Sequence, residues 1–226
     1  MDFSVQTSIT SKAAAKLLIS GEINIEGTWA SNSARKVLDE ILSLSIDDIL
    51  KIIDCNNYGD VADVKNIPQF GKIETVINVP SYFVDNGNCC ADYPQLGFFL
   101  KQDVNATLIA NTKFGENHGK AASILGIVNC VHTRIVPSAL TYSFVELNQN
   151  QKEEIIKRLL FRIPVVQIIL YSAKNGKVNG YDAMAQLMES TKRRRSQCLR
   201  AIFRTLKDFN NVNLSARIDN IVWEDE

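Results

Sequence analysis

The chain has 226 residues, enough for one large domain or two small ones with a sizeable apolar core. Hydrophobic residues make up 46% and charged residues 22%, which is typical of a globular protein in water. Lysine and arginine number 25 together, as do aspartate and glutamate, so the formal net charge is zero. This counts against a histone-like protein that coats nucleic acid through a high overall positive charge. A local basic patch is not excluded, because phosphate attraction acts within a Debye length of about 8 Å.

Neither a membrane span nor a secretory leader is expected from the sequence. No segment reaches the roughly 18 uninterrupted apolar residues that cross a bilayer. The first residues, Met1–Ser4, have neither the basic nor the apolar region of a signal peptide. Five cysteines, an odd number, indicate reduced thiols rather than a disulfide framework. We therefore expect a cytoplasmic protein that does not contact membranes.

The first part of the chain, residues 1–70, is predicted to be a small helical segment. Ser45-Ile-Asp-Asp48 is typical of a capping box, with aspartate in the position that glutamate usually holds. A glycine after the first helix and Asn56-Asn57 after the last provide stop signals. The predicted helices cover residues 12–19, 33–42 and 46–53. The next stretch, Ile73–Val79, fits a strand as well as a helix.

Residues 71–149 are predicted to form a first winged-helix-like domain. Helices are expected at Tyr93–Leu100 and Asn117–Leu125, the second ended by Gly126. Val128–Val136 is rich in β-branched residues and is expected to be extended, before a further helix at Leu140–Leu147. Two helices followed by an extended piece are the local order of a winged helix.

Residues 150–226 are predicted to form a second winged-helix domain, in which the same order is clearer. An amphipathic helix over 150–163 precedes Pro164, which can start the next helix. A short helix at Tyr181–Met188 and a longer one at Thr191–Lys207 should follow. Val212–Trp223 alternates in hydrophobicity, as a strand pair or wing would.

The long C-terminal helix is predicted to be the main DNA contact. Its apolar residues share one face, which leaves the basic face free to enter a major groove about 12 Å wide. Arginine suits guanine edges, whereas lysine and threonine suit phosphates. Four cations in the first turns are unfavourable for the helix dipole, which favours an anionic partner over a merely solvated face. The predicted contacts are Thr191, Lys192, Arg193, Arg194, Arg195, Arg200 and Arg204.

Three sequence features carry a resemblance to a known type of region. Ile163-Pro164-Val165, the Thr191-Lys-Arg-Arg-Arg195 helix start, and the block from Gly115 to Val128 followed by Leu140-Thr141 together resemble the tandem winged-helix region of type II restriction endonucleases and related bacterial defence proteins. The similarity covers roughly residues 91–207. It implies two DNA-reading units in one chain, with any nuclease domain elsewhere.

The resemblance adds a second set of candidate DNA contacts, in the first winged helix: Asn117, His118, Lys120 and Ser123. The same stretch is a near miss of a phosphate-binding loop. Phe114 stands where the first glycine should be, and Ala121 replaces the magnesium-binding hydroxyl. Nucleotide hydrolysis is therefore not expected.

Two features of the sequence imitate metal sites. Asp63-Val64-Lys65, with Asp47, Asp48 or Asp60 upstream, imitates the carboxylate and lysine pattern of metal-dependent nucleases, but its flanks are polar and turn-like. Cys89, Cys90, Cys130 and His132 are soft ligands, yet adjacent cysteines rarely bind one tetrahedral zinc ion. We predict no metal, no cofactor and no catalytic residue.

The sequence as a whole predicts an α+β, mostly helical protein with tandem winged helix-turn-helix units after a small helical N-terminal segment. The expected function is non-catalytic, sequence-reading binding of double-stranded DNA, as a regulator or as the recognition subunit of a restriction or defence system. A homodimer or a defence-system protein is a further expected partner. The alternatives are a small metal-dependent DNA nuclease and a winged-helix protein-interaction module.

Overall fold

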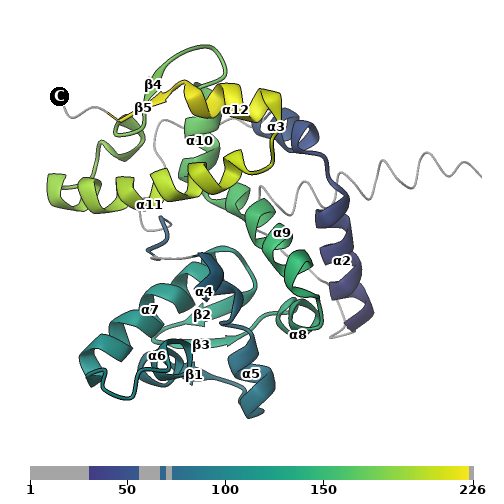
Figure 1. The fold of residues 1–226 in the computed structure, drawn as a ribbon, viewed down its shortest axis with the longest axis vertical. Coiled ribbons are helices and arrows are strands. Elements are labelled where there is room, and N and C mark those ends of the chain that lie inside the picture. The colour runs from purple at the N-terminus through teal and green to yellow at the C-terminus, as the bar shows by residue number, and fades with distance from the viewer. Residues whose placement is uncertain (1–30, 56–66, 70–72, 224–226) are drawn as a thin grey trace, which may run out of the picture. The chain divides into compact units, whose positions relative to one another are not determined.

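The computed structural model describes residues 31–55, 67–69 and 73–223 (Figure 1). They fall into two compact units, each consisting of helices and one small sheet. Unit 1 contains residues 43–55, 67 and 157–223, and unit 2 contains residues 31–42, 68–69 and 73–156. The predicted α+β, mostly helical class is confirmed. Each unit combines separate stretches of the chain, whereas the sequence suggested consecutive domains at 1–70, 71–149 and 150–226.

Unit 2 contains a short antiparallel sheet in the order β1-β3-β2. In it, Ile135 pairs with Ala91 on one side and with Cys130 on the other. The strands are β1 (Ala91–Asp92), β2 (Val128–Val131) and β3 (Arg134–Pro137). The helices are α2 (Ser31–Ser43), α4 (Ile73–Ile77), α5 (Ser81–Asn86), α6 (Tyr93–Lys101), α7 (Leu108–Ile124) and α8 (Thr141–Val145). Helix α6 packs on α7, and α7 contacts both β2 and β3 (Figure 1).

Local capping explains where α6 and α7 begin and end. Asp92 and Gln95 form a capping box at the start of α6. Thr107 caps α7 by accepting a hydrogen bond from the Ala110 backbone N–H at 3.2 Å. Gly126, with φ of +81°, ends α7 as predicted. The helix begins at Leu108 rather than at Asn117, because Thr107 caps it there and packing on α6 stabilises a first half that includes Asn111, Thr112 and Gly115, which disfavour helices.

Unit 1 is built around α10 and α11. Its helices are α3 (Ile46–Cys55), α10 (Pro164–Ser172), α11 (Glu189–Lys207) and α12 (Val212–Asp219), with 3₁₀ turns η2 (Leu160–Arg162) and η3 (Asp182–Met184). The strands β4 (Val178–Asn179) and β5 (Ile221–Val222) form a parallel pair. Helix α9 (Gln149–Leu159) contains the boundary between the two units. Fully buried side chains of α3, α10, α11 and α12 form the core, among them Ile49, Ile53, Val166, Leu170, Leu199, Ile202 and Leu214.

Several predicted elements of unit 1 are confirmed. Pro164 occupies the first turn of α10, and the α11 face of Leu199, Ile202, Phe203 and Leu206 is buried. At the start of α3, the Ser45 hydroxyl accepts from the Asp48 backbone N–H at 3.1 Å. The reciprocal half of the capping box differs, because the Asp48 carboxylate accepts from the Ser45 hydroxyl itself, at 2.6 Å.

The end of the chain differs from its predicted wing. Residues 212–219 form helix α12, which Asn211 caps by accepting a hydrogen bond from the Leu214 backbone N–H at 2.9 Å. The alternating pattern was misleading, because the Asn211 cap and the packing of α12 on α3 and α11, with Leu214 buried, favour a helix. Tyr181–Met188 contains a 3₁₀ turn instead of an α-helix. Within its described residues, unit 1 therefore has no antiparallel hairpin after α11.

Two further predictions concern an extended segment in unit 2 and a helix near the N-terminus. Val128–Val136 was expected to be extended, and it forms the β2–β3 hairpin. The expected helix at residues 12–19 lies outside the described residues. Across 31–55, 67–69 and 73–223, none of the helices combines the length and apolar character that membrane crossing requires.

Candidate nucleic-acid interface

Helix α7 presents four residues in a line on its solvent side. Ile109, Lys113, Glu116 and Lys120, here called the α7 outer face, fall within about 60° of one another at 100° per residue. The opposite side is buried and small, with Asn111, Gly115, His118, Gly119, Ala121 and Ala122. Burial of that side against α6 and the sheet leaves the outer face free to meet a partner.

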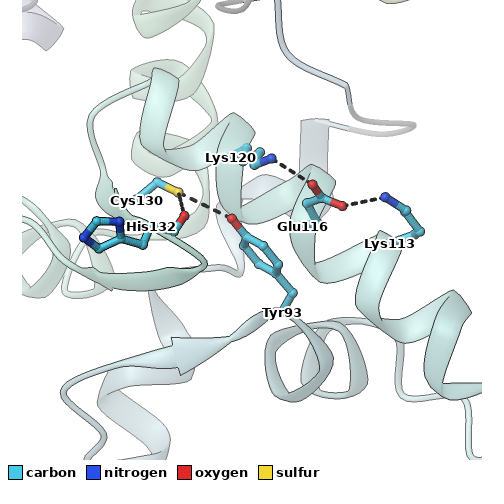
Figure 2. Close-up of polar contacts among 6 residues, drawn as sticks. All are labelled: Tyr93, Lys113, Glu116, Lys120, Cys130 and His132. Atoms are coloured by element: carbon cyan, nitrogen blue, oxygen red, sulfur yellow. Dashed lines mark hydrogen bonds and ion pairs between the residues drawn. The ribbon is translucent and has the colours of Figure 1, made fainter.

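Glu116 joins the two lysines of the outer face (Figure 2). Its carboxylate accepts from Lys113 Nζ and from Lys120 Nζ, each at 2.8 Å. These hydrogen bonds lower the pKa of the Glu116 carboxyl, so it is ionised at neutral pH. Both lysines stay largely accessible, with side chains 70% and 51% exposed. Exposed pairs of this kind are weak, about 0.3–0.5 kcal/mol each, so a phosphate can displace the carboxylate.

Tyr93 connects α6, α7 and the β2–β3 hairpin. Its hydroxyl lies 3.6 Å from Cys130 Sγ, and the Cys130 thiol donates to the His132 carbonyl at 3.7 Å (Figure 2). Lys120 Nζ lies 5.7 Å from the centre of the Tyr93 ring, within cation–π range. Burial, followed by the contact with Cys130, raises the pKa of Tyr93, so it stays a neutral phenol. Tyr93 thus positions Lys120 relative to the hairpin.

The hairpin turn is exposed and carries a cation. Val131 pairs with Arg134, which leaves His132 and Thr133 as a two-residue turn. His132 has φ of +56°, in the left-handed region that such tight turns use. Residues Val131 to Arg134 are all exposed. The turn therefore presents an exposed cation, Arg134, to the solvent.

The structure separates the four candidates predicted in this region. Lys120 lies on the outer face, and Asn117 and Ser123 flank it, partly exposed. The prediction for His118 is corrected: the residue is only 3% exposed, and its ring packs on Phe114 at a tilt of 35°, with ring centres 4.1 Å apart. Its Nδ1 lies 2.8 Å from the Phe114 carbonyl oxygen, and burial lowers its pKa, so the ring is neutral and belongs to the core.

Helix α11 carries a second charged surface, in unit 1. Arg193, Arg200, Arg204 and Lys207, here called the α11 basic stripe, recur at helical spacing and are all exposed. Lys207 lies 14 residues after Arg193, about 21 Å along the helix at 1.5 Å per residue. This stripe is the predicted basic face, extended by Lys207 at its C-terminal end.

The other predicted DNA contacts on α11 differ in how far their side chains are buried. Arg195 is half-buried and donates to the Ile67 carbonyl at 2.5 Å, and burial lowers its pKa, so it is a structural residue. Lys192 is mostly covered and lies 3.7 Å from Glu189, and Thr191 is partly buried. Arg194 is exposed and lies beside the stripe.

The stripe itself is only lightly neutralised. Arg200 stacks on Trp223 at 5.4 Å and donates to its carbonyl at 3.3 Å, which holds the guanidinium on the surface. Arg193 lies 3.7 Å from Glu189, and Lys207 forms an ion pair with Asp219. Arg204 forms no ion pair with another described residue. The stripe thus keeps a net positive charge.

A cleft of about 540 Å³ lies in unit 1 among α3, the end of α10 and α12. Its charged groups are paired within the protein. Arg217 binds the Asp54 carboxylate with two hydrogen bonds, of 2.7 and 2.9 Å, and Lys174 lies 2.9 Å from the same group. Asn213 donates to Asp47 at 2.9 Å. The charged and polar groups that line the cleft therefore hold α3 to α12.

The metal-based alternatives gain no support within the described residues. No group of three or more potential metal ligands occurs there, neither around Cys130 and His132 nor around Asp47 and Asp48. Asp60 and Asp63-Val64-Lys65 lie outside the described residues. The near miss of a phosphate-binding loop, residues 114–121, is the interior of α7.

Comparison of the chain with protein-family models, with curated proteins and with solved structures gave no match. Sequence reasoning missed Ile109, Lys113, Glu116 and Arg134 as candidate interface residues. The lysine–glutamate spacing at 113, 116 and 120 was a readable signal of a helix face. It was overlooked because the helix was predicted to begin at Asn117.

Proposed function

We propose that this chain binds double-stranded DNA and reads its sequence, with unit 2 as a winged helix-turn-helix. In this proposal α7 enters the major groove and the β2–β3 hairpin is the wing. The observation that carries it is the order α5, β1, α6, α7 and hairpin, with β3 between β1 and β2. In helix-turn-helix proteins the second helix of the pair reads the groove, which here is α7.

The dimensions and charges of unit 2 support the proposal. Helix α7 has 17 residues, about 25 Å of length, and a major groove about 12 Å wide admits one helix. Lys113 and Lys120 provide phosphate or guanine contacts, and Asn117 can pair with an adenine edge. Arg134 at the hairpin adds a cation where a wing would contact the backbone.

The α11 basic stripe supports a second contact with the same kind of ligand. Since α12 replaces the expected wing, we propose α11 as a phosphate-binding helix rather than as a second winged-helix reader. Phosphate contacts fix a protein on the duplex without reading the bases. In this division of roles, unit 2 selects the sequence and unit 1 adds affinity.

The test is the salt dependence of binding to fluorescently labelled duplex DNA, measured by anisotropy on the full chain. Arg193→Gln/Arg204→Gln removes two cations of the stripe that have few internal contacts. We expect weaker binding and a slope of log affinity against log salt that is smaller by about 2, one unit per lost phosphate contact. Lys113→Gln/Lys120→Gln should weaken binding and relax sequence preference.

The matched control is Lys36→Gln/Lys177→Gln, which removes two exposed lysines outside both surfaces. It should keep the affinity and slope of the unaltered protein. If all three variants bind duplex DNA with the affinity of the unaltered protein, the proposed function is wrong.

A further inference from the structure

Ile109 is an unusual residue for its position. It is 78% exposed, although it heads the α7 outer face that continues with Lys113, Glu116 and Lys120. Leu108, beside it, is 70% exposed. Leaving apolar side chains in water costs free energy, so two adjacent ones at the start of a helix are explained when a partner covers them.

The neighbours of Ile109 indicate which partner this is. The next turns of the same face carry lysines rather than further apolar residues, so the face combines one apolar contact with cations. The major groove of DNA offers that combination, since phosphates flank the 5-methyl group of thymine, its main apolar feature. A protein partner would be favoured by an apolar row along the helix. The exposed apolar residues Phe98, Val104 and Leu108 lie off the α7 outer face, in α6, before α7 and beside Ile109, and the face itself continues with charged residues.

We infer that Ile109, flanked by Leu108, contacts the 5-methyl group of a pyrimidine in the major groove, so that the protein prefers sites with a methylated pyrimidine at one position. This inference rests on the proposed function and specifies its ligand. Thymine and 5-methylcytosine carry the same methyl group at C5, and both can fill the contact. The first residues of a recognition helix are those that meet base edges, which is where Ile109 lies.

The experiment begins with a duplex selected from a random library by the full-length protein. Each thymine is then replaced in turn by deoxyuridine, which removes only the methyl group, and each cytosine by 5-methylcytosine, which adds it. At one position we expect affinity to change about four- to tenfold, the effect of covering one methyl group. Weaker binding after replacement by deoxyuridine assigns the contact to a thymine methyl group. Tighter binding after replacement by 5-methylcytosine assigns it to a methylated cytosine.

Ile109→Ala should bind the selected duplex more weakly and lose the preference for the methylated base, whereas Val212→Ala, an equally exposed apolar residue in α12, should retain both. Equal affinity for methylated and unmethylated duplexes overturns the inference but leaves DNA binding intact. Absence of any duplex binding overturns both. If Ile109→Ala changes only the sedimentation of the free protein, the residue contacts protein and the inference is wrong.

Discussion

Gly97 of α6 and Gly115 of α7 lie against each other where the two helices cross. A Cβ atom on Gly115 would lie 2.6 Å from the Gly97 backbone nitrogen and 2.0 Å from the Tyr93 carbonyl oxygen. Both neighbours are backbone atoms, which cannot rotate away. The close approach brings α7 onto α6 and so determines how the α7 outer face is presented.

Gly115→Ala should therefore destabilise the protein although alanine favours helices. The helix propensity gain is about 1 kcal/mol, and overpacking at a backbone contact costs about 3 kcal/mol, so a net loss of about 2 kcal/mol is expected. Urea denaturation followed by circular dichroism measures it. Gly87→Ala is the control, since open space surrounds Gly87 and only its φ of +62° costs about 1 kcal/mol. A neutral Gly115→Ala would show that the crossing is not tight.

Under the proposed function, Glu116→Gln should strengthen DNA binding. The substitution removes the only negative charge of the α7 outer face and weakens the hold on Lys113 and Lys120. We expect affinity for duplex DNA to rise about three- to tenfold at low salt, with a steeper salt slope. Glu146→Gln makes the same charge change at an exposed residue of unit 2 outside α7 and should have little effect. A decrease in affinity with Glu116→Gln would mean that the carboxylate itself contacts the ligand.

Asp54→Asn should weaken unit 1 and change its acid sensitivity. Hydrogen bonds from Arg217, and then from Lys174, hold the pKa of Asp54 below its ordinary value of 3.8. The stabilisation is complete above that value and is lost as the pH falls through the lower folded-state pKa, because the unfolded chain binds the proton first. We expect a loss of about 1–3 kcal/mol at pH 7. Urea denaturation midpoints at pH 7 and near pH 3 measure this loss of stability. Between the two pH values, the midpoint of Asp54→Asn should fall less than that of the unaltered protein. Equal losses in both proteins would contradict the expectation.

His118 should make unit 2 less stable below neutral pH. Burial lowers its pKa from 6.5 despite the contact with the Phe114 carbonyl, so the unfolded chain is protonated first. Stability should therefore fall as the pH drops below about 6.5, until the folded-state pKa is reached. His118→Gln should remove this part of the pH dependence, which thermal melts between pH 8 and pH 5 can follow. His132→Gln, at the exposed hairpin turn, is the control and should keep the pH dependence of the unaltered protein.

Helix faces and end signals could be predicted from the sequence alone, because both are local. The amphipathic face of α11, the proline that begins α10 and the glycine that ends α7 depend on neighbours within a few residues. The basic face around Arg193 to Arg204 was predicted for the same reason. The charged residues on it alternate with buried ones at helical spacing.

Burial and strand pairing depended on contacts between distant parts of the chain. Ile135 joins residues 91 and 130 in one sheet, and packing on α6 extends α7 back to Leu108 and turns His118 inward. Local alternation in residues 212–223 suggested a strand, but the Asn211 cap and packing on α3 and α11 favour a helix. Which cations stay exposed was decided by the same packing, since the tertiary structure covers Arg195 and leaves Arg204 in water.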